Sequence, residues 1–174
     1  NWLADDAILP SDSDIDVLIV LDGVLPRDKP GKFRYQGVLL EVSWLSRGEI
    51  STPEQILCSS HLAGSFHRSG IMLDPGGHLT RMQQAVARQY AQRRWVEARC
   101  RHAETKTRYG FPLREEDPFP EQVAAWLFPT GITTHILLLA GLRNPTVRTR
   151  YLATRELLAA YGHLDVYETL LEQL

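Results

Sequence analysis

The chain has 174 residues, of which 44% are hydrophobic and 23% charged, as in a globular protein of one large or two small domains. Its formal net charge of -2 lacks the strongly basic balance typical of a duplex nucleic-acid binder and favours a small or nucleotide-like substrate. The only two cysteines, Cys58 and Cys100, lack zinc-ligand spacing and are too few for a disulfide scaffold.

The sequence carries no signal for a membrane span. The longest apolar runs, over residues 17–21 and 136–142, are far shorter than the roughly 18 residues needed to cross a bilayer. A signal-peptide pattern is also missing from the printed sequence. We therefore expect a cytoplasmic protein that makes no membrane contact.

The first predicted elements are extended. A β-branched, almost continuous apolar run over 15–21 is typical of a strand buried on both faces. Residues 23–32, which include two prolines, are typical of a connecting loop. A second extended stretch follows over 33–45, and it places Glu41 inside a strand.

Helical signals dominate from residue 52 onwards. Thr52 and Gln55 form a capping-box pattern that predicts a helix ending near Gly70. A short strand is expected over 71–73, and one long helix over 79–107.

The rest of the chain is predicted to be all-helical, with helices over 120–128, 133–142 and 144–162 and a last one from Asp165. A mixed α/β pattern followed by an all-α pattern indicates an α+β protein of two domains. We place the domain boundary near residue 77.

The most informative residues are two aspartates at the mouth of the first strand, Asp14 and Asp16. Carboxylates at positions i and i+2 of a strand project to the same face, so this pair can converge on one ion. Glu41, on the next extended stretch, can add a third oxygen ligand. Hard cations such as Mg²⁺ take oxygen ligands and are often held by two carboxylates together with substrate phosphates. These three acidic residues are therefore the predicted metal ligands.

Four other interpretations compete for the acidic run. A solvated turn is the commonest use of Asp-x-Asp, but an unpaired charge entering an apolar strand is unfavourable. A calcium loop fails because Val17 and Gly23 occupy the positions of its required glycine and glutamate. Val20 replaces the nucleophilic aspartate of a haloacid-dehalogenase-like phosphatase, and a glycosidase dyad needs carboxyl groups farther apart.

The run Ser13-Asp14-Ile15-Asp16-Val17 before a strand, with Leu40-Glu41-Val42 on the next, closely resembles the signature of the DNA polymerase β-like nucleotidyltransferases. The acidic loop over 3–10 makes the chain similar to the small bacterial nucleotidyltransferase-domain proteins of that superfamily, which include aminoglycoside nucleotidyltransferases. The resemblance covers residues 1–75.

The family also carries a Gly-Ser pair about a dozen residues before its two aspartates, and Asn1 stands where its serine is expected. Asn1 and Ser13 are therefore the predicted nucleotide-binding positions. The family's glycine, first strand and first helix would precede Asn1, so we expect the native protein to begin upstream of this chain.

The resemblance implies a polymerase β-like mixed sheet with flanking helices over 1–77, followed by an all-α helical bundle over 78–174. It implies transfer of a nucleoside monophosphate from a nucleoside triphosphate to a hydroxyl of a small acceptor, such as an aminoglycoside-like antibiotic. Two Mg²⁺ ions would be held by Asp14, Asp16 and Glu41, which are thus also the predicted catalytic residues.

The implied partners are the nucleoside triphosphate and the small hydroxylated acceptor, with neither duplex nucleic acid nor membrane, and a homodimer is compatible with this interpretation. Two alternatives keep the fold. One is a non-catalytic nucleotide-binding or regulatory protein, and the other is a toxin-antitoxin component that nucleotidylates a partner protein.

Glu97 is a further candidate, as a general base. It lies four residues before Arg101 on the predicted long helix, so the two side chains share a face. In the family the C-terminal helices close over the nucleotide and sometimes supply a general base. On spacing alone, an ordinary surface ion pair is the more frequent outcome of this pattern.

Overall fold

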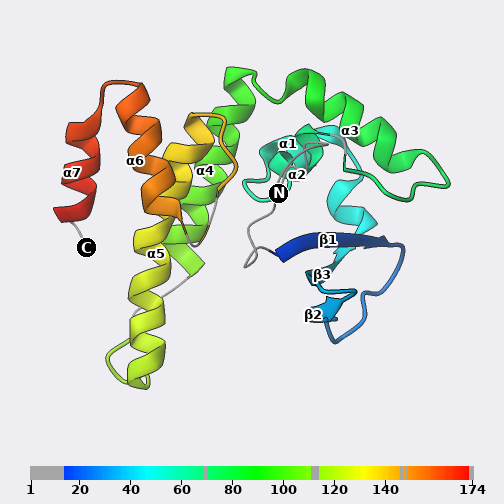
Figure 1. Cartoon of the computed structure of the whole chain (residues 1–174), viewed down its shortest axis with the longest axis horizontal. Coiled ribbons are helices and arrows are strands. Elements are labelled where there is room, and N and C mark those ends of the chain that lie inside the picture. Colours follow the sequence, from blue (N-terminus) through cyan, green and yellow to red (C-terminus); the bar gives the residue numbers. More distant parts are fainter. Residues whose placement is uncertain (1–13, 69, 111–113, 146, 148, 173–174) are drawn as a thin grey trace. The chain divides into compact units, whose positions relative to one another are not determined.

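The structure, a computed structural model, describes residues 14–68, 70–110, 114–145, 147 and 149–172 (Figure 1). The described chain divides into two compact units. Unit 1 contains the described residues up to Ile56 together with Ser65–Ala87. Unit 2 contains Leu57–Gly64 together with the described residues from Arg88 onwards.

Unit 1 is built on a mixed sheet that has, among the described residues, three strands in the order β1-β3-β2 (Figure 1). β1 (Asp14–Leu21) runs parallel to β3 (Val38–Ser46), whereas β2 (Gly31–Tyr35) runs antiparallel to β3. Together with the helices that follow, this sheet gives the α+β class that the sequence predicted.

A tight turn joins β2 to β3. Gln36 and Gly37 have φ angles of 50° and 83°, and positive φ at both central residues is the requirement of a type I′ hairpin. The turn fixes the pairing of the two strands and places Lys32 directly opposite Glu41. The prediction of one extended stretch over 33–45 therefore missed a hairpin, whose first strand begins inside the predicted loop.

β1 is more exposed than predicted. Leu18 and Ile19 on this strand are 41% and 38% exposed. β1 pairs only with β3, so it forms an edge of the described sheet, and the prediction of a strand buried on both faces was wrong. The buried apolar side chains of unit 1 come instead from β3 and from the segments after it: Val42, Leu45, Ile50, Ile56, Phe66 and Val86.

The capping box at residue 52 is confirmed. Thr52 Oγ1 accepts the backbone N–H of Gln55, and Gln55 Oε1 accepts that of Thr52, each at 3.3 Å. α1 (Pro53–Cys58) is nevertheless shorter than predicted, and α2 (Ala63–His67) follows as a separate helix. The break has a local cause, because Ser59 Oγ accepts the backbone N–H of Leu62 at 3.2 Å and so stabilises a turn.

The strand predicted over 71–73 is not formed. Met72 and Leu73 are 86% and 79% exposed in a loop. The following Asp74 accepts hydrogen bonds from the backbone N–H and the hydroxyl of Thr80, at 2.8 and 2.7 Å. These bonds hold the start of α3 (His78–Gln89), so the segment acts as the entry to a helix rather than as a strand.

Unit 2 consists mainly of α4 (Arg93–Gly110), α5 (Phe119–Ala140), α6 (Arg150–Ala160) and α7 (Leu164–Glu172). Each of these helices packs against the next one along the chain.

The single long helix predicted over 79–107 is divided into α3 and α4. At the break, the fully buried Arg99 donates from Nη2 to the backbone carbonyl of Tyr90 at 2.9 Å. In a continuous helix that carbonyl would accept an N–H four residues later. Here the Arg99 side chain donates instead of that N–H, so the Tyr90 carbonyl has a hydrogen-bond partner just after α3 ends.

The two helices predicted over 120–128 and 133–142 form one helix, α5, which contains Pro129. Thr130 Oγ1 donates to the carbonyl of Leu127 at 2.9 Å, beside the backbone that the proline disturbs. By length and composition alone α5 could also cross a membrane, and only 22% of its most apolar window is buried, but a single such helix is weak evidence for a membrane span.

Candidate metal centre

The three predicted metal ligands lie together on the sheet of unit 1. Asp14 and Asp16 occupy alternate positions of β1, and the backbone pairing of β1 with β3 makes Asp16 the direct partner of Glu41. One carboxylate oxygen from each residue lies within 4.8 Å of the others. The parallel register therefore brings together acidic residues that are 25 positions apart in the sequence.

A basic residue that the sequence analysis did not single out completes the cluster. Lys32 on β2 is the direct partner of Glu41, and its Nζ lies 2.9 Å from Glu41 Oε2. The same ammonium also forms an ion pair with Asp14 Oδ2. The side chain of Asp14 is 18% exposed, compared with 41% for Glu41 and 44% for Lys32. The cluster is therefore partly open to water.

A signal for Lys32 was present in the sequence. Gly37 allows a two-residue turn, and pairing outward from such a turn places residue 32 opposite residue 41. This pairing was missed because the predicted loop over 23–32, assigned on its prolines, includes the first two residues of β2.

The charges of the cluster act on one another. Partial burial of Asp16, together with the nearby negative charges of Asp14 and Glu41, raises the pKa of Asp16. The pKa of the Lys32 ammonium is raised as well, by the hydrogen bonds that it donates to Asp14 and Glu41. The carboxylates thus contribute to both shifts, after burial in the case of Asp16 and as the main cause in the case of Lys32.

The donor set suits a hard divalent cation. Three carboxylates supply oxygen atoms only, and oxygen is the preferred ligand of such ions. Three negative charges against the one positive charge of Lys32 leave two negative charges when all four groups are ionised. The cluster can therefore hold a metal ion, which would remove the repulsion that raises the pKa of Asp16.

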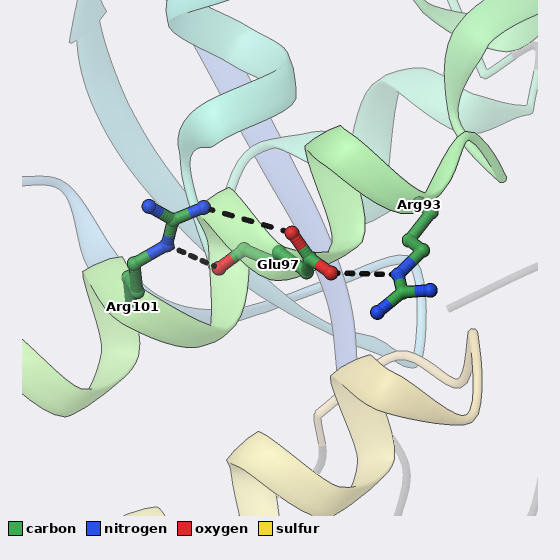
Figure 2. Close-up of polar contacts among 3 residues, drawn as sticks. All are labelled: Arg93, Glu97 and Arg101. Atoms are coloured by element: carbon green, nitrogen blue, oxygen red, sulfur yellow. Dashed lines mark hydrogen bonds and ion pairs between the residues drawn. The ribbon is translucent and has the colours of Figure 1, made fainter.

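Glu97, the candidate general base, lies on α4 in unit 2 between two arginines (Figure 2). Its Oε1 is 2.7 Å from Arg93 Nε, and its Oε2 is 3.8 Å from Arg101 Nη2. The Glu97 side chain is 47% exposed. The contact with Arg101 is the i,i+4 ion pair that the spacing predicted, the pair with Arg93 is an additional one, and the role of Glu97 as a base stays a prediction.

The predicted nucleotide-binding residues, Asn1 and Ser13, lie outside the described residues. Comparison of the chain with protein-family models, curated proteins and solved structures finds no match. The resemblance to the polymerase β-like nucleotidyltransferases thus stays a prediction that rests on the sequence motif.

Proposed function

We propose that the protein is a magnesium-dependent nucleotidyltransferase, which moves a nucleoside monophosphate from a nucleoside triphosphate to a hydroxyl group of a small acceptor. The observation that carries this proposal is the convergence of Asp14, Asp16 and Glu41 within 4.8 Å on one face of the sheet. A triphosphate is strongly negative, so an acidic cluster can face it only with cations in between.

Asp14, Asp16 and Glu41 would hold the magnesium ions, with Glu41 completing the site on the side of the acceptor hydroxyl. When bound, Mg²⁺ neutralises phosphate charge and lowers the pKa of the acceptor hydroxyl. The protein contributes by holding the metal ligands in fixed positions. All three carboxylates stand on paired strands, whose backbone hydrogen bonds keep them at fixed separations.

Two magnesium ions, a nucleoside triphosphate and a small hydroxylated acceptor complete the proposal, and an aminoglycoside-like antibiotic is one acceptor to test. The partly exposed position of the cluster leaves access for a dissolved triphosphate. We place the activity in the cytoplasm, where nucleoside triphosphates and magnesium are available.

The proposal is tested by pyrophosphate release from each of the four ribonucleoside triphosphates, with Mg²⁺ and a panel of aminoglycosides and other polyhydroxylated acceptors. Asp16→Asn and Glu41→Gln should each lower the rate about 100-fold or more, because each removes a ligand of the metal ions that would stabilise the charge of the reacting groups. The matched control is Asp22→Asn, which removes an acidic residue that is 71% exposed and pairs with Arg47. That variant should keep the wild-type rate.

Full magnesium-dependent transfer by a folded Asp16→Asn protein would overturn the assignment. A thermal shift with triphosphate and Mg²⁺, but no transfer to any acceptor, would instead favour a non-catalytic nucleotide-binding protein. Glu97→Gln tests the candidate base separately: a general base should lower kcat when replaced, whereas a surface ion pair should leave kcat unchanged.

A further inference from the structure

Lys32 stands inside the acidic cluster as its internal cation. The ammonium contacts Asp14 on β1 and lies 2.9 Å from Glu41 on β3, although its own backbone belongs to β2. The sheet therefore delivers one positive side chain and three negative ones to the same place from three strands. The contacts use two of the three carboxylates that the proposed function assigns to the metal.

The backbone fixes the position of Lys32 in the sheet, whereas the ammonium end of its side chain can move. Lys32 and Glu41 are direct partners in an antiparallel pair, which brings their side chains to the same face of the sheet. The Lys32 side chain is 44% exposed and has four rotatable carbon–carbon links, so the ammonium can leave the carboxylates for water without any change in the strand.

An ammonium and a divalent cation at the same carboxylates repel each other. Both are drawn to Asp14 and Glu41, and at contact distances the repulsion between them changes affinity by about a factor of ten even in a water-exposed site. A metal ion that binds this cluster must therefore displace the ammonium or bind less tightly beside it.

We propose that Lys32 is a built-in competitor of the metal, which occupies the carboxylates until a metal–triphosphate complex arrives and which then contacts the triphosphate. The inference rests on the proposed function, because the triphosphate is the anion that gives the displaced ammonium a new partner. Metal and triphosphate then bind cooperatively. The protein alone binds metal weakly, and its carboxylates are released for the metal only together with the substrate.

The first test measures Mn²⁺ binding by the protein without nucleotide, using electron paramagnetic resonance to count free Mn²⁺. Lys32→Gln should bind Mn²⁺ about tenfold more tightly than the wild type, because the competing charge is gone. Lys32→Arg, which keeps a positive charge, should stay within about threefold of the wild type. Lys29→Gln removes the same charge from an exposed position before β2 and should also leave the affinity unchanged.

The second test repeats the titration with a non-hydrolysable ATP analogue. In the wild type the analogue should increase Mn²⁺ affinity by a larger factor than in Lys32→Gln, because only the wild type has an ammonium to transfer. Circular dichroism and the thermal midpoint of each variant establish that it is folded.

Equal Mn²⁺ affinity of the wild type and Lys32→Gln would overturn the role of Lys32 and leave the metal centre in place. Binding by neither protein, with or without the analogue, would overturn the metal centre and both proposals with it. An equal effect of Lys29→Gln and Lys32→Gln would show that net charge alone is responsible and would also overturn the specific role of Lys32.

Discussion

Asp16 and Glu41 are direct partners across two parallel strands, so the backbone of the sheet holds two like charges side by side. Like charges directly opposite each other in a sheet are destabilising, by about 0.2–1 kcal/mol for an exposed pair. A fold that keeps such a pair gives up stability at this point. A bound cation would recover that stability, which makes the pair a sensitive probe of the metal centre.

Asp16→Asn is therefore expected to stabilise the metal-free protein by about 0.2–1 kcal/mol, since the amide removes one of the opposed charges at nearly constant shape. In excess Mg²⁺ the order should reverse, because only the wild type gains binding energy from the ion. Urea unfolding with EDTA and with Mg²⁺ measures both effects. Destabilisation by Asp16→Asn in EDTA would contradict the repulsion.

The difference in stability between Asp16→Asn and the wild type in EDTA should depend on pH in a defined direction. The pKa of Asp16 is raised in the folded protein above the ordinary value of 3.8, because of burial and of the charges of Asp14 and Glu41. Between those two pKa values the folded state binds more protons than the unfolded state, so the wild type gains stability as the pH falls. The advantage of Asp16→Asn in EDTA should accordingly shrink from neutral pH towards pH 4.

The acidic residues of the centre were predicted from the sequence, whereas the lysine was missed although the sequence carries a signal for the turn that places it. Alternation along a strand is a local rule, and it was enough to put Asp14 and Asp16 on one face. The contact between Lys32 and Glu41 depends on the pairing of two strands, which is not a local property. That pairing is set by a single turn at residues 36–37. An error of two residues in a loop boundary hid that pairing.

The break between α3 and α4 could not be predicted from a local pattern. The apolar pattern over 79–107 is continuous and does not reveal the turn after residue 89, in which the carbonyl of Gln89 accepts the N–H of Gln92 at 2.9 Å. At the interruption, the buried side chain of Arg99 bonds to the carbonyl of Tyr90. A pattern of apolar spacing contains no information about a charged side chain that turns back to bond a main-chain carbonyl.

Arg99→Lys is expected to destabilise the protein by about 1–3 kcal/mol. The guanidinium is 0% exposed, donates to the carbonyls of Leu57 and Tyr90, and lies over the Tyr90 ring with its Cζ 4.3 Å from the centroid. A lysine ammonium has neither the planar fork nor the reach to keep both bonds and the stacking. Thermal and urea unfolding measure the loss.

Arg101→Lys is the matched control for this substitution, because Arg101 is on the same helix but 71% exposed. Its contact with Glu97 is a surface ion pair, so the same replacement should change stability by less than about 0.5 kcal/mol. Equal effects of the two replacements would contradict the structural role of Arg99.

Because of His102, the protein should become less stable as the pH is lowered from neutral. Its Nδ1 accepts the backbone N–H of Ser60 at 3.1 Å, so a proton on Nδ1 would abolish that bond. Burial first, and then the charge of Lys106, lowers the pKa of His102 below its ordinary value of 6.5. The unfolded state therefore binds more protons just below pH 6.5, and stability decreases as the pH falls through that value.

His102→Asn isolates this effect, because the amide oxygen of asparagine can accept the same N–H but does not titrate. The neighbouring groups remain, including His61, whose ring is stacked 5.9 Å away, and Lys106. The free energy of unfolding, followed from pH 7.5 to 5, should fall more steeply for the wild type than for this variant. Parallel curves would exclude His102 as the source of the dependence.

Two glycines, Gly131 inside α5 and Gly141 directly after it, should respond differently to replacement by alanine. At Gly141, which follows the last turn, a Cβ would lie 2.5 Å from Leu157 Cδ1, and Leu157 is only 5% exposed. Because that leucine is packed between helices, Gly141→Ala should destabilise the protein by about 1–3 kcal/mol.

At Gly131 a Cβ would instead meet the guanidinium end of Arg150, a long side chain that is only partly buried and can move aside. Gly131→Ala should therefore be close to neutral, since the better helix propensity of alanine, up to about 1 kcal/mol, offsets the displacement of Arg150. Unfolding midpoints of both variants test the contrast. If Leu157→Ala removed the penalty of Gly141→Ala in a double-mutant cycle, the clash itself would be established as its cause.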